Sequence, residues 1–202
     1  MNILTIEKDS IFEEAINKSK FIAYSFALKN FEQIEKYLNM LQKEYSDATH
    51  ICYAYKFLGT EKAVDNGEPQ GTAGKPILEC IKKQNYSNVL VVVVRYFGGI
   101  KLGAGGLTRA YGNSAQKVLT QSGQKQMFEC KKVAFKLPIT ENKKLSFLSN
   151  IQDIFDLKTT YDQSINIVFF VKTEQIEAIF KQIESIFSQK IQFETSEQVI
   201  LI

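Results

Sequence analysis

Residues 89–111 of this 202-residue chain, VLVVVVRYFGGIKLGAGGLTRAY, join a long apolar run to a cluster of glycines, and few folds accommodate both. Six apolar β-forming residues at 89–94 predict a strand that is buried on both faces. Five glycines follow within nine positions, and a helical pattern begins after them. A buried strand that turns through glycines into a helix presents backbone N–H groups to an anion. We therefore expect a strand, a tight corner and a helix here.

The glycine spacing of the corner matches neither of two well-known phosphate-binding motifs. Ala104 stands where a Walker A loop requires Lys, and Thr108 stands where a dinucleotide fingerprint has its third Gly or Ala. Three cations, Arg95, Lys101 and Arg109, nevertheless lie in or beside the corner. Two interpretations stay open at this point: the corner binds phosphate, or its glycines only allow close packing against a neighbouring element.

The composition is that of an ordinary soluble globular protein, with 45% hydrophobic and 23% charged residues. Residues 1–127 carry 16 Lys and Arg against 12 Asp and Glu, a net charge of +4, whereas residues 128–202 carry 9 against 10, a net charge of −1. The basic first part permits an RNA or phosphate ligand. Cys52, Cys80 and Cys130 lie far apart, so we expect no disulfide framework and no zinc site. With no signal peptide or membrane span in the sequence, we expect a cytoplasmic protein.

Hydrophobic periodicity and turn signals predict an α+β fold with two domains, at residues 1–127 and 128–202. We expect Asn30 and Thr72 to be helix N-caps in the first domain. The elements predicted for the first domain are strands at 19–28, 49–58 and 89–94, helices at 31–45, 75–84 and 105–121, and a loop at 59–73. We also expect some strand before residue 19.

The second domain shows the β-α-β-β-α-β order of the split ferredoxin-like motif. Its predicted elements are a strand at 128–137, a helix at 140–153, a hairpin of 157–161 and 165–173, a helix at 174–188 and a strand at 198–202.

Two groups of residues outside the corner suggest further chemistry. His50, the only histidine, and Cys52 share one face of a strand, which allows a nucleophilic pair. Because the sequence identifies no third group to orient the histidine, it favours a partly buried histidine without a catalytic role. Asp65 and Glu68 lie in the glycine-rich loop, where they either act as acid and base or shape a turn. The enzyme interpretation requires His50, Asp65 and Glu68 to converge on one cleft.

Three ordered stretches resemble the IMPACT/YigZ family: DATHICYAYKF at 47–57, DNGEPQGTAGKPILECI at 65–81 and VVVVRYFGGIKLGAGGLTRAYG at 91–112, with KSKFIA at 18–23. The resemblance implies a first domain similar to the second domain of a ribosomal small-subunit protein and to domain IV of elongation factor G. It also implies a ferredoxin-like second domain similar to the last domain of elongation factor G. Asn66 replaces the second Asp of the family's usual Asp-Asp-Gly-Glu-Pro, which disfavours a two-carboxylate metal site.

The resemblance implies that the family's eukaryotic members act as translational regulators by competing for a protein that activates a stress kinase. Bacteria lack that kinase pathway, so this role does not transfer to the bacterial two-domain form. The domains that this chain resembles, however, face RNA. The leading hypothesis is therefore a nucleic-acid- or ribosome-associated binding protein that regulates translation, with no cofactor, no metal and no assigned catalytic residue. The alternatives are an enzyme or sensor that binds a small phosphorylated ligand at the corner, and a protein-interaction module. The candidate binding residues are His50, Asp65, Glu68, Thr72, Lys75, Arg95, Tyr96, Gly98, Gly99, Lys101, Gly103, Gly105, Gly106 and Arg109.

Overall fold

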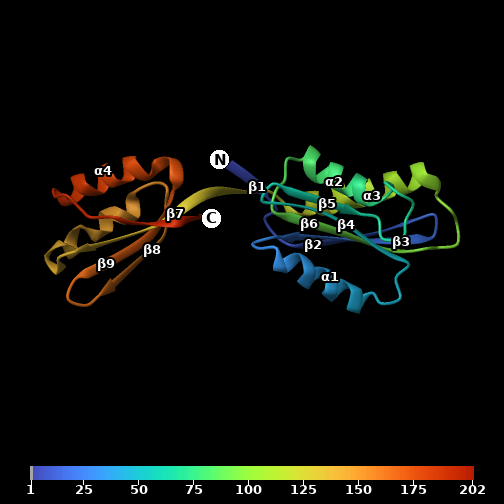
Figure 1. The fold of residues 1–202 in the computed structure, drawn as a ribbon, viewed down its shortest axis with the longest axis horizontal. Helices are drawn as coiled ribbons and strands as arrows, with labels where there is room; N and C mark the ends of the chain where they lie inside the picture. Colours follow the sequence, from blue (N-terminus) through green and yellow to red (C-terminus); the bar gives the residue numbers. More distant parts are fainter. Residues whose placement is uncertain (1) are drawn as a thin grey trace. The chain divides into compact units, whose positions relative to one another are not determined.

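The computed structural model describes residues 2–202 and divides them into two compact units. The first unit comprises residues 3–126, and the second comprises residues 127–202 together with Asn2. Each unit contains its own sheet, helices and apolar core (Figure 1). The protein therefore has the mixed α+β architecture that periodicity predicts.

The first unit is built on a five-stranded antiparallel sheet with β6 (Val89–Tyr96) at its centre. The strand order is β2-β3-β6-β4-β5, so β2 and β5 form the two edges. The other strands are β2 (Ser10–Ile16), β3 (Ser19–Ala27), β4 (His50–Phe57) and β5 (Thr60–Val64).

Helices cover both faces of this sheet, α1 (Glu32–Glu44) on one side and α2 (Gly74–Lys83) with α3 (Gly103–Ser122) on the other (Figure 1). Successive side chains of a strand point to opposite faces. Accordingly, Val89, Val91 and Val93 join the core beneath α2 and α3, while Leu90, Val92 and Val94 join the core beneath α1. The prediction of a strand buried on both faces is confirmed.

The sheet of the second unit has the strands β7, β9 and β8 in that order, and β10 also pairs with β7. Helices η1 and α4 contribute side chains to a single core with this sheet. The remaining helices and strands of the described chain are β1 (Asn2–Thr5), β7 (Lys125–Leu137), the 3-10 helix η1 (Ile139–Asn150), β8 (Ile154–Tyr161), β9 (Ile165–Lys172), the 3-10 helix η2 (Thr173–Gln175), α4 (Ile176–Phe187) and β10 (Glu194–Leu201).

The prediction that residues 59–73 form a loop throughout is wrong, because β5 occupies the first part of that range. Leu58 and Gly59 both have positive φ and turn β4 directly back into β5. The strand lies at the edge of the sheet, and four of its five residues are exposed. It consequently lacks the apolar alternation by which a half-buried strand is recognised.

The helix predicted at 140–153 is a 3-10 helix at Ile139–Asn150. Leu148 is its only buried residue, so no apolar stripe favours the α-helical period. The last strand begins at Glu194, four residues before the predicted start at 198. Exposed polar residues at its beginning conceal that start from a search for apolar patterns.

Candidate functional site: a cavity at the strand-to-helix corner

The corner between β6 and α3 borders a cavity of about 400 Å³. Residues from four separate stretches of the chain line it, which shows how the fold gathers them. The lining residues are Thr49, His50, Glu68, Pro69, Arg95, Phe97, Lys101, Leu102, Gly103, Ala104 and Leu107. The volume lies within the range of small-molecule sites.

Different structural constraints explain glycine at different positions of the corner. A Cβ at Gly98 would lie 1.9 Å from the carbonyl oxygen of Lys18, so this position requires the close approach of two backbone segments. Gly99 and Gly103 have positive φ, at 86° and 69°, with open space around them. Gly105 is exposed in the first turn of α3, and a Cβ at Gly106 would lie 3.0 Å from the Cβ of Leu102. Packing therefore accounts for Gly98, and backbone conformation accounts for Gly99 and Gly103.

The N-terminus of α3 opens onto the cavity without a side-chain cap. Its N-cap residue is Leu102, which offers no oxygen to the first N–H groups, and the first turn contains no acidic residue. Gly103 and Ala104 of this turn line the cavity and are exposed. Uncapped N–H groups and the partial positive charge of a helix N-terminus favour an anion at this position.

A buried charge cluster lies beside the same cavity. The Glu68 carboxylate accepts hydrogen bonds from Arg95 Nη1 at 2.6 Å and from the Tyr111 hydroxyl at 2.8 Å. The Arg95 and Glu68 side chains are only 5% and 3% exposed. Arg95 Nη2 also donates to Ser19 Oγ at 3.4 Å, whereas its Nε has no partner among residues 2–202. Because the pair is buried, removing either partner would leave the other as an uncompensated charge inside the protein.

His50 completes this cluster on the β4 side. Its Nδ1 lies 3.1 Å from the carbonyl oxygen of Asn66, and because a carbonyl only accepts, Nδ1 carries a proton. Its Nε2 lies 3.9 Å from Glu68 Oε1. Two of the three residues required by the enzyme interpretation therefore meet beside the cavity.

The third residue, Asp65, is engaged elsewhere. Its carboxylate accepts the backbone N–H groups of Gly71, Ala73 and Gly74 at 2.8–3.0 Å. Burial alone would raise the pKa of Asp65, but these three hydrogen bonds outweigh it and lower the pKa. Asp65 thus satisfies the orphan N–H groups at the start of α2. It does not converge with His50 and Glu68.

Asp65 also replaces the N-cap that the sequence suggests for α2. The prediction that Thr72 caps this helix is wrong, because its hydroxyl donates to the Pro69 carbonyl at 2.6 Å and α2 has no cap from its N-cap residue, Ala73. For α1, the assigned N-cap is Phe31, but the Asn30 side chain accepts the N–H of Gln33 at 3.1 Å. Asn30 therefore supplies the predicted capping hydrogen bond.

The pairing of Cys52 with His50 as a nucleophile has no support in the geometry. The Cys52 thiol is buried and donates to the Asp65 carbonyl at 2.8 Å and to the Tyr111 hydroxyl at 3.4 Å. Burial raises the pKa of Cys52 to about 12, which leaves almost no thiolate at neutral pH. Burial also raises the pKa of Tyr111.

The exposed cations of the candidate set divide between the cavity and the helices. Lys101 is exposed and lines the cavity. Arg109 is exposed and does not line it, but its Nη1 lies 3.8 Å from where a Cβ on Gly105 would stand, so its side chain extends back toward the start of α3. Lys75 is exposed on α2, outside the cavity lining. Tyr96, the aromatic member of the candidate set, also lies outside the lining, and its hydroxyl donates to Asp47 Oδ1 at 2.7 Å.

The structure thus joins His50, Glu68, Arg95, Lys101 and Gly103 at one cavity, and leaves the other nine candidates outside its lining. The sequence-based set omitted several residues of the cavity and of its charge cluster. Glycine content and charge drew attention to the corner, but apolar lining residues and a buried hydroxyl give no such signal. The omitted residues are Ser19, Thr49, Pro69, Phe97, Leu102, Ala104, Leu107 and Tyr111.

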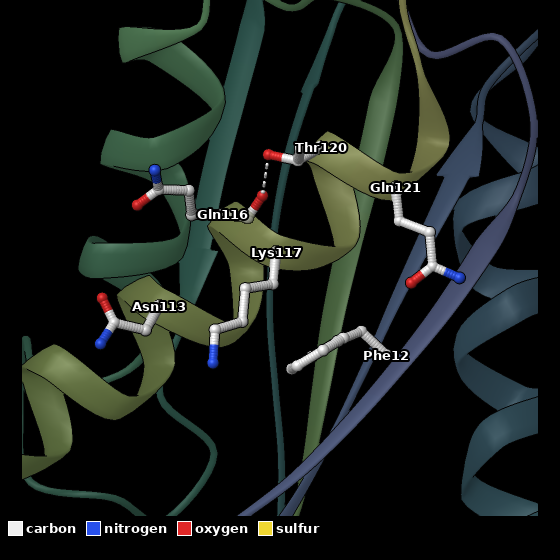
Figure 2. A pocket seen from close by; sticks show the side chains of 6 residues that line it. All are labelled: Phe12, Asn113, Gln116, Lys117, Thr120 and Gln121. Carbon is white, nitrogen blue, oxygen red and sulfur yellow. Dashed lines mark hydrogen bonds between the residues drawn. The ribbon is translucent and has the colours of Figure 1, made fainter.

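A second hollow lies between α3 and β2 (Figure 2). Phe12 and Lys117 border it, and the Lys117 ammonium is paired with Glu14 at 2.6 Å and lies 5.0 Å from the centre of the Phe12 ring. The Thr120 hydroxyl donates to the backbone carbonyl of Gln116 within the same helix (Figure 2). The cation and the hydroxyl of this hollow are thus already engaged, and it contains none of the candidate residues.

Residues 2–202 contain neither a clustered metal-binding group nor a helix that could cross a membrane. No group of three or more His, Cys, Asp and Glu side chains in that range is placed to hold a metal ion. No helix in the same range has the length and apolar character needed to cross a membrane.

Comparison with known proteins identifies the family. The Impact N-terminal domain matches residues 17–119, about half of the chain, and this chain belongs to the IMPACT family. It is 42% identical over 123 residues to the IMPACT family member YvyE of Bacillus subtilis, a match that covers 59% of this chain and 56% of YvyE. It is 37% identical over 113 residues to the IMPACT family member YigZ of Escherichia coli, covering 54% of this chain and 55% of YigZ. The match spans only about half the length of these relatives.

A solved structure shares the fold over nearly the whole chain. The crystal structure of a hypothetical protein superimposes with a TM-score of 0.67, covers 98% of both chains and has 24% sequence identity to this one. Similarity at this level of identity supports the fold and says nothing of function.

Proposed function

We propose that this protein is a cytoplasmic RNA- or ribosome-associated binding protein with a regulatory role in translation. The proposal is supported chiefly by two cations that form no ion pair with a described residue, Lys101 in the cavity lining and Arg109 near the start of α3.

Some of the positive charges near the cavity are neutralised by a carboxylate, and others are not. Glu68 neutralises Arg95 in the buried pair, so Arg95 contributes little free charge. Lys101, Arg109 and the uncapped start of α3 remain, and neither side chain forms an ion pair with any described residue. Phosphate oxygens are the acceptors that best match such N–H groups and cations.

We propose the finer fold assignments on similar grounds. Numbered along the chain, the four strands of residues 125–202 lie in the order 4-1-3-2, that is β10-β7-β9-β8, which is the order of a ferredoxin-like sheet. We assign this fold to residues 128–202, and an elongation factor G domain IV-like fold to residues 1–127. In translation factors such domains face RNA, which suits the proposed partner.

The test is the salt dependence of RNA binding by the full chain and by the double variant Lys101→Ala, Arg109→Ala. Each phosphate contact on single-stranded RNA contributes about 0.7 to the slope of log K against log salt concentration. We expect the variant to bind more weakly and to lose about 1.4 from that slope.

The matched control is Lys36→Ala, Lys43→Ala, which removes the same charge from exposed positions on α1, on the opposite face of the sheet. It should leave the slope nearly unchanged. An equal slope for the wild type and the Lys101, Arg109 variant would remove these residues from the contact and refute this placement of the site.

A second candidate, a small phosphorylated ligand, is favoured by the cavity volume and by the buried Glu68, Arg95 and His50 cluster beside it. Thermal denaturation with and without inorganic phosphate and nucleotides tests this candidate. A stabilisation lost in Lys101→Ala, together with absence of RNA binding, would favour the small ligand over RNA.

A further inference from the structure

We infer that the second unit binds single-stranded RNA on the sheet face that its helices leave uncovered. The inference rests on the proposed function for the identity of the partner, and it adds a second contact surface and the strandedness of the RNA. We call this surface the open face. It comprises Lys132, Ala134 and Lys136 of β7, Phe155, Lys158 and Thr160 of β8, and Asn166, Val168, Phe170 and Lys172 of β9.

Strand register places these residues together. Lys132, Ala134 and Lys136 lie directly opposite Phe170, Val168 and Asn166 on β9. The alternating residues between them, including Val133, Phe135, Ile167 and Phe169, are buried in the core with α4 and η1. The open face is therefore the side of the sheet away from that core.

Aromatic rings occupy the middle of the open face. Phe155 on β8 and Phe170 on β9 are opposite neighbours in the register, which brings their side chains next to each other. Both are half-buried, and Phe155 also stacks on Phe128, with ring centres 6.3 Å apart and planes 19° from parallel. Adjacent rings on a solvent-facing sheet are platforms on which unpaired bases stack.

Four lysines lie on the open face, and one of them, Lys132, is directly opposite Phe170 in the register. Lys132 and Lys136 are exposed, and neither ammonium forms an ion pair with a residue in the described range 2–202. Lys158 and Lys172 are held by Asp156 at 2.7 Å and Asp153 at 2.5 Å. The chain from 128 to 202 has a net charge of −1. Lys132, opposite Phe170, and Lys136, opposite Asn166, therefore add free positive charge to the open face of a unit that is not basic as a whole.

The open face also carries polar side chains that can form hydrogen bonds with the edges of bases. A hollow of about 430 Å³ on this face is bordered by Lys136, Asn166, Gln192 and Glu194. Amides both donate and accept, and a carboxylate accepts from the amino groups of cytosine or adenine. The face thus combines stacking surface, phosphate contacts and hydrogen-bonding groups.

The strandedness follows from the rings. In a duplex the bases are stacked on one another and cannot lie on Phe155 and Phe170, whereas the unpaired bases of a single strand can. Duplex RNA would contact the lysines alone. A preference for single-stranded RNA over duplex RNA is therefore part of the inference.

The experiment measures binding of the full chain to a fluorescently labelled 12-nucleotide RNA and to a 16-base-pair RNA duplex. The variant Phe155→Leu, Phe170→Leu keeps apolar bulk in the sheet but removes the aromatic faces. We expect it to lose roughly tenfold in single-strand affinity per ring, with an unchanged salt slope and little effect on the duplex. The matched control Phe155→Tyr, Phe170→Tyr retains both rings and should keep most of the wild-type affinity.

Charge is tested separately. Lys132→Gln, Lys136→Gln should reduce the salt slope by about 0.7 for each lysine, whereas Lys143→Gln, Lys181→Gln, on the helical side of this unit, should not change it. Circular dichroism of each variant checks that the fold is retained. Unchanged single-strand binding in both the phenylalanine and the lysine variants would overturn the inference.

The outcomes separate this inference from the proposed function. If only the Lys101, Arg109 variant weakens RNA binding, the proposed function stands and the open face is excluded. If wild-type protein binds no RNA, the proposed function fails and this inference fails with it. A partner captured from lysate that resists ribonuclease and is lost with Phe155→Leu, Phe170→Leu would assign the face to protein and overturn it as well.

Discussion

At the scale of single residues, the buried charges of the first unit depend on Glu68. Its carboxylate accepts both the Arg95 guanidinium and the Tyr111 hydroxyl, and Arg95 lies 5.5 Å from the centres of the Phe21 and Phe97 rings. Without Glu68, the guanidinium would be a buried charge without a counter-ion. Removing one partner of a buried pair costs more than the pair itself contributes.

We therefore predict that Glu68→Gln lowers the free energy of unfolding by about 3–5 kcal/mol. Tyr111→Phe keeps the ring and removes the hydroxyl that donates to Glu68 and accepts from Cys52, and it should cost only about 1–3 kcal/mol. Urea denaturation followed by circular dichroism measures both. Equal stability of Glu68→Gln and wild type would show that Arg95 does not need this counter-ion.

Cys52 offers a second test at this scale. Because burial raises its pKa to about 12, the thiol should stay protonated and unreactive in the native protein at pH 8. Mass spectrometry after brief exposure to iodoacetamide should find Cys52 unmodified in native protein and modified in urea. Rapid native modification would contradict the buried, hydrogen-bonded thiol and reopen a nucleophilic role.

At the scale of elements, Asp65 fixes the start of α2 from a position nine residues before that helix begins. Its three backbone hydrogen bonds lower the pKa of its carboxyl group, so the stabilisation is present above the unfolded pKa, near 3.8. It is lost as pH falls through the lower native pKa, because protonation removes the charge that the N–H groups bind.

We predict that Asp65→Ala costs about 1–2 kcal/mol at pH 7, the upper range for loss of a helix cap, and that the cost shrinks below about pH 4. Thermal unfolding at pH 7 and pH 3 measures it. The control is Thr72→Val, which leaves the three hydrogen bonds intact and should be milder. A larger effect for Thr72→Val would restore the cap suggested by the sequence.

The elements also show which patterns in the sequence suffice for prediction. The unbroken apolar run at 89–94 identifies a strand buried on both faces, and β6 is buried on both. The strand β5 escapes prediction because its exposed, polar residues are fixed by pairing with β4 instead of by burial. Likewise, the cap of α2 is missed because Asp65 acts across a loop, where no fixed spacing reveals it.

At the scale of the whole molecule, the family and the fold class can be inferred from the sequence, whereas the candidate site can be predicted only in part. The corner and its cations are recognisable from glycines and charges. The burial of Arg95 cannot be recognised from the sequence, because its partner Glu68 is 27 residues away and only the fold joins them. The face of lysines and rings on the second sheet similarly depends on strand register.

We claim that RNA phosphate binds at the uncapped start of α3, and amide NMR of the full chain during titration with single-stranded RNA checks that position residue by residue. We predict that the largest backbone shifts fall at residues 101–106 and disappear in Lys101→Ala, Arg109→Ala. Shifts confined to other parts of the chain, with residues 101–106 unmoved at saturation, would contradict the claim.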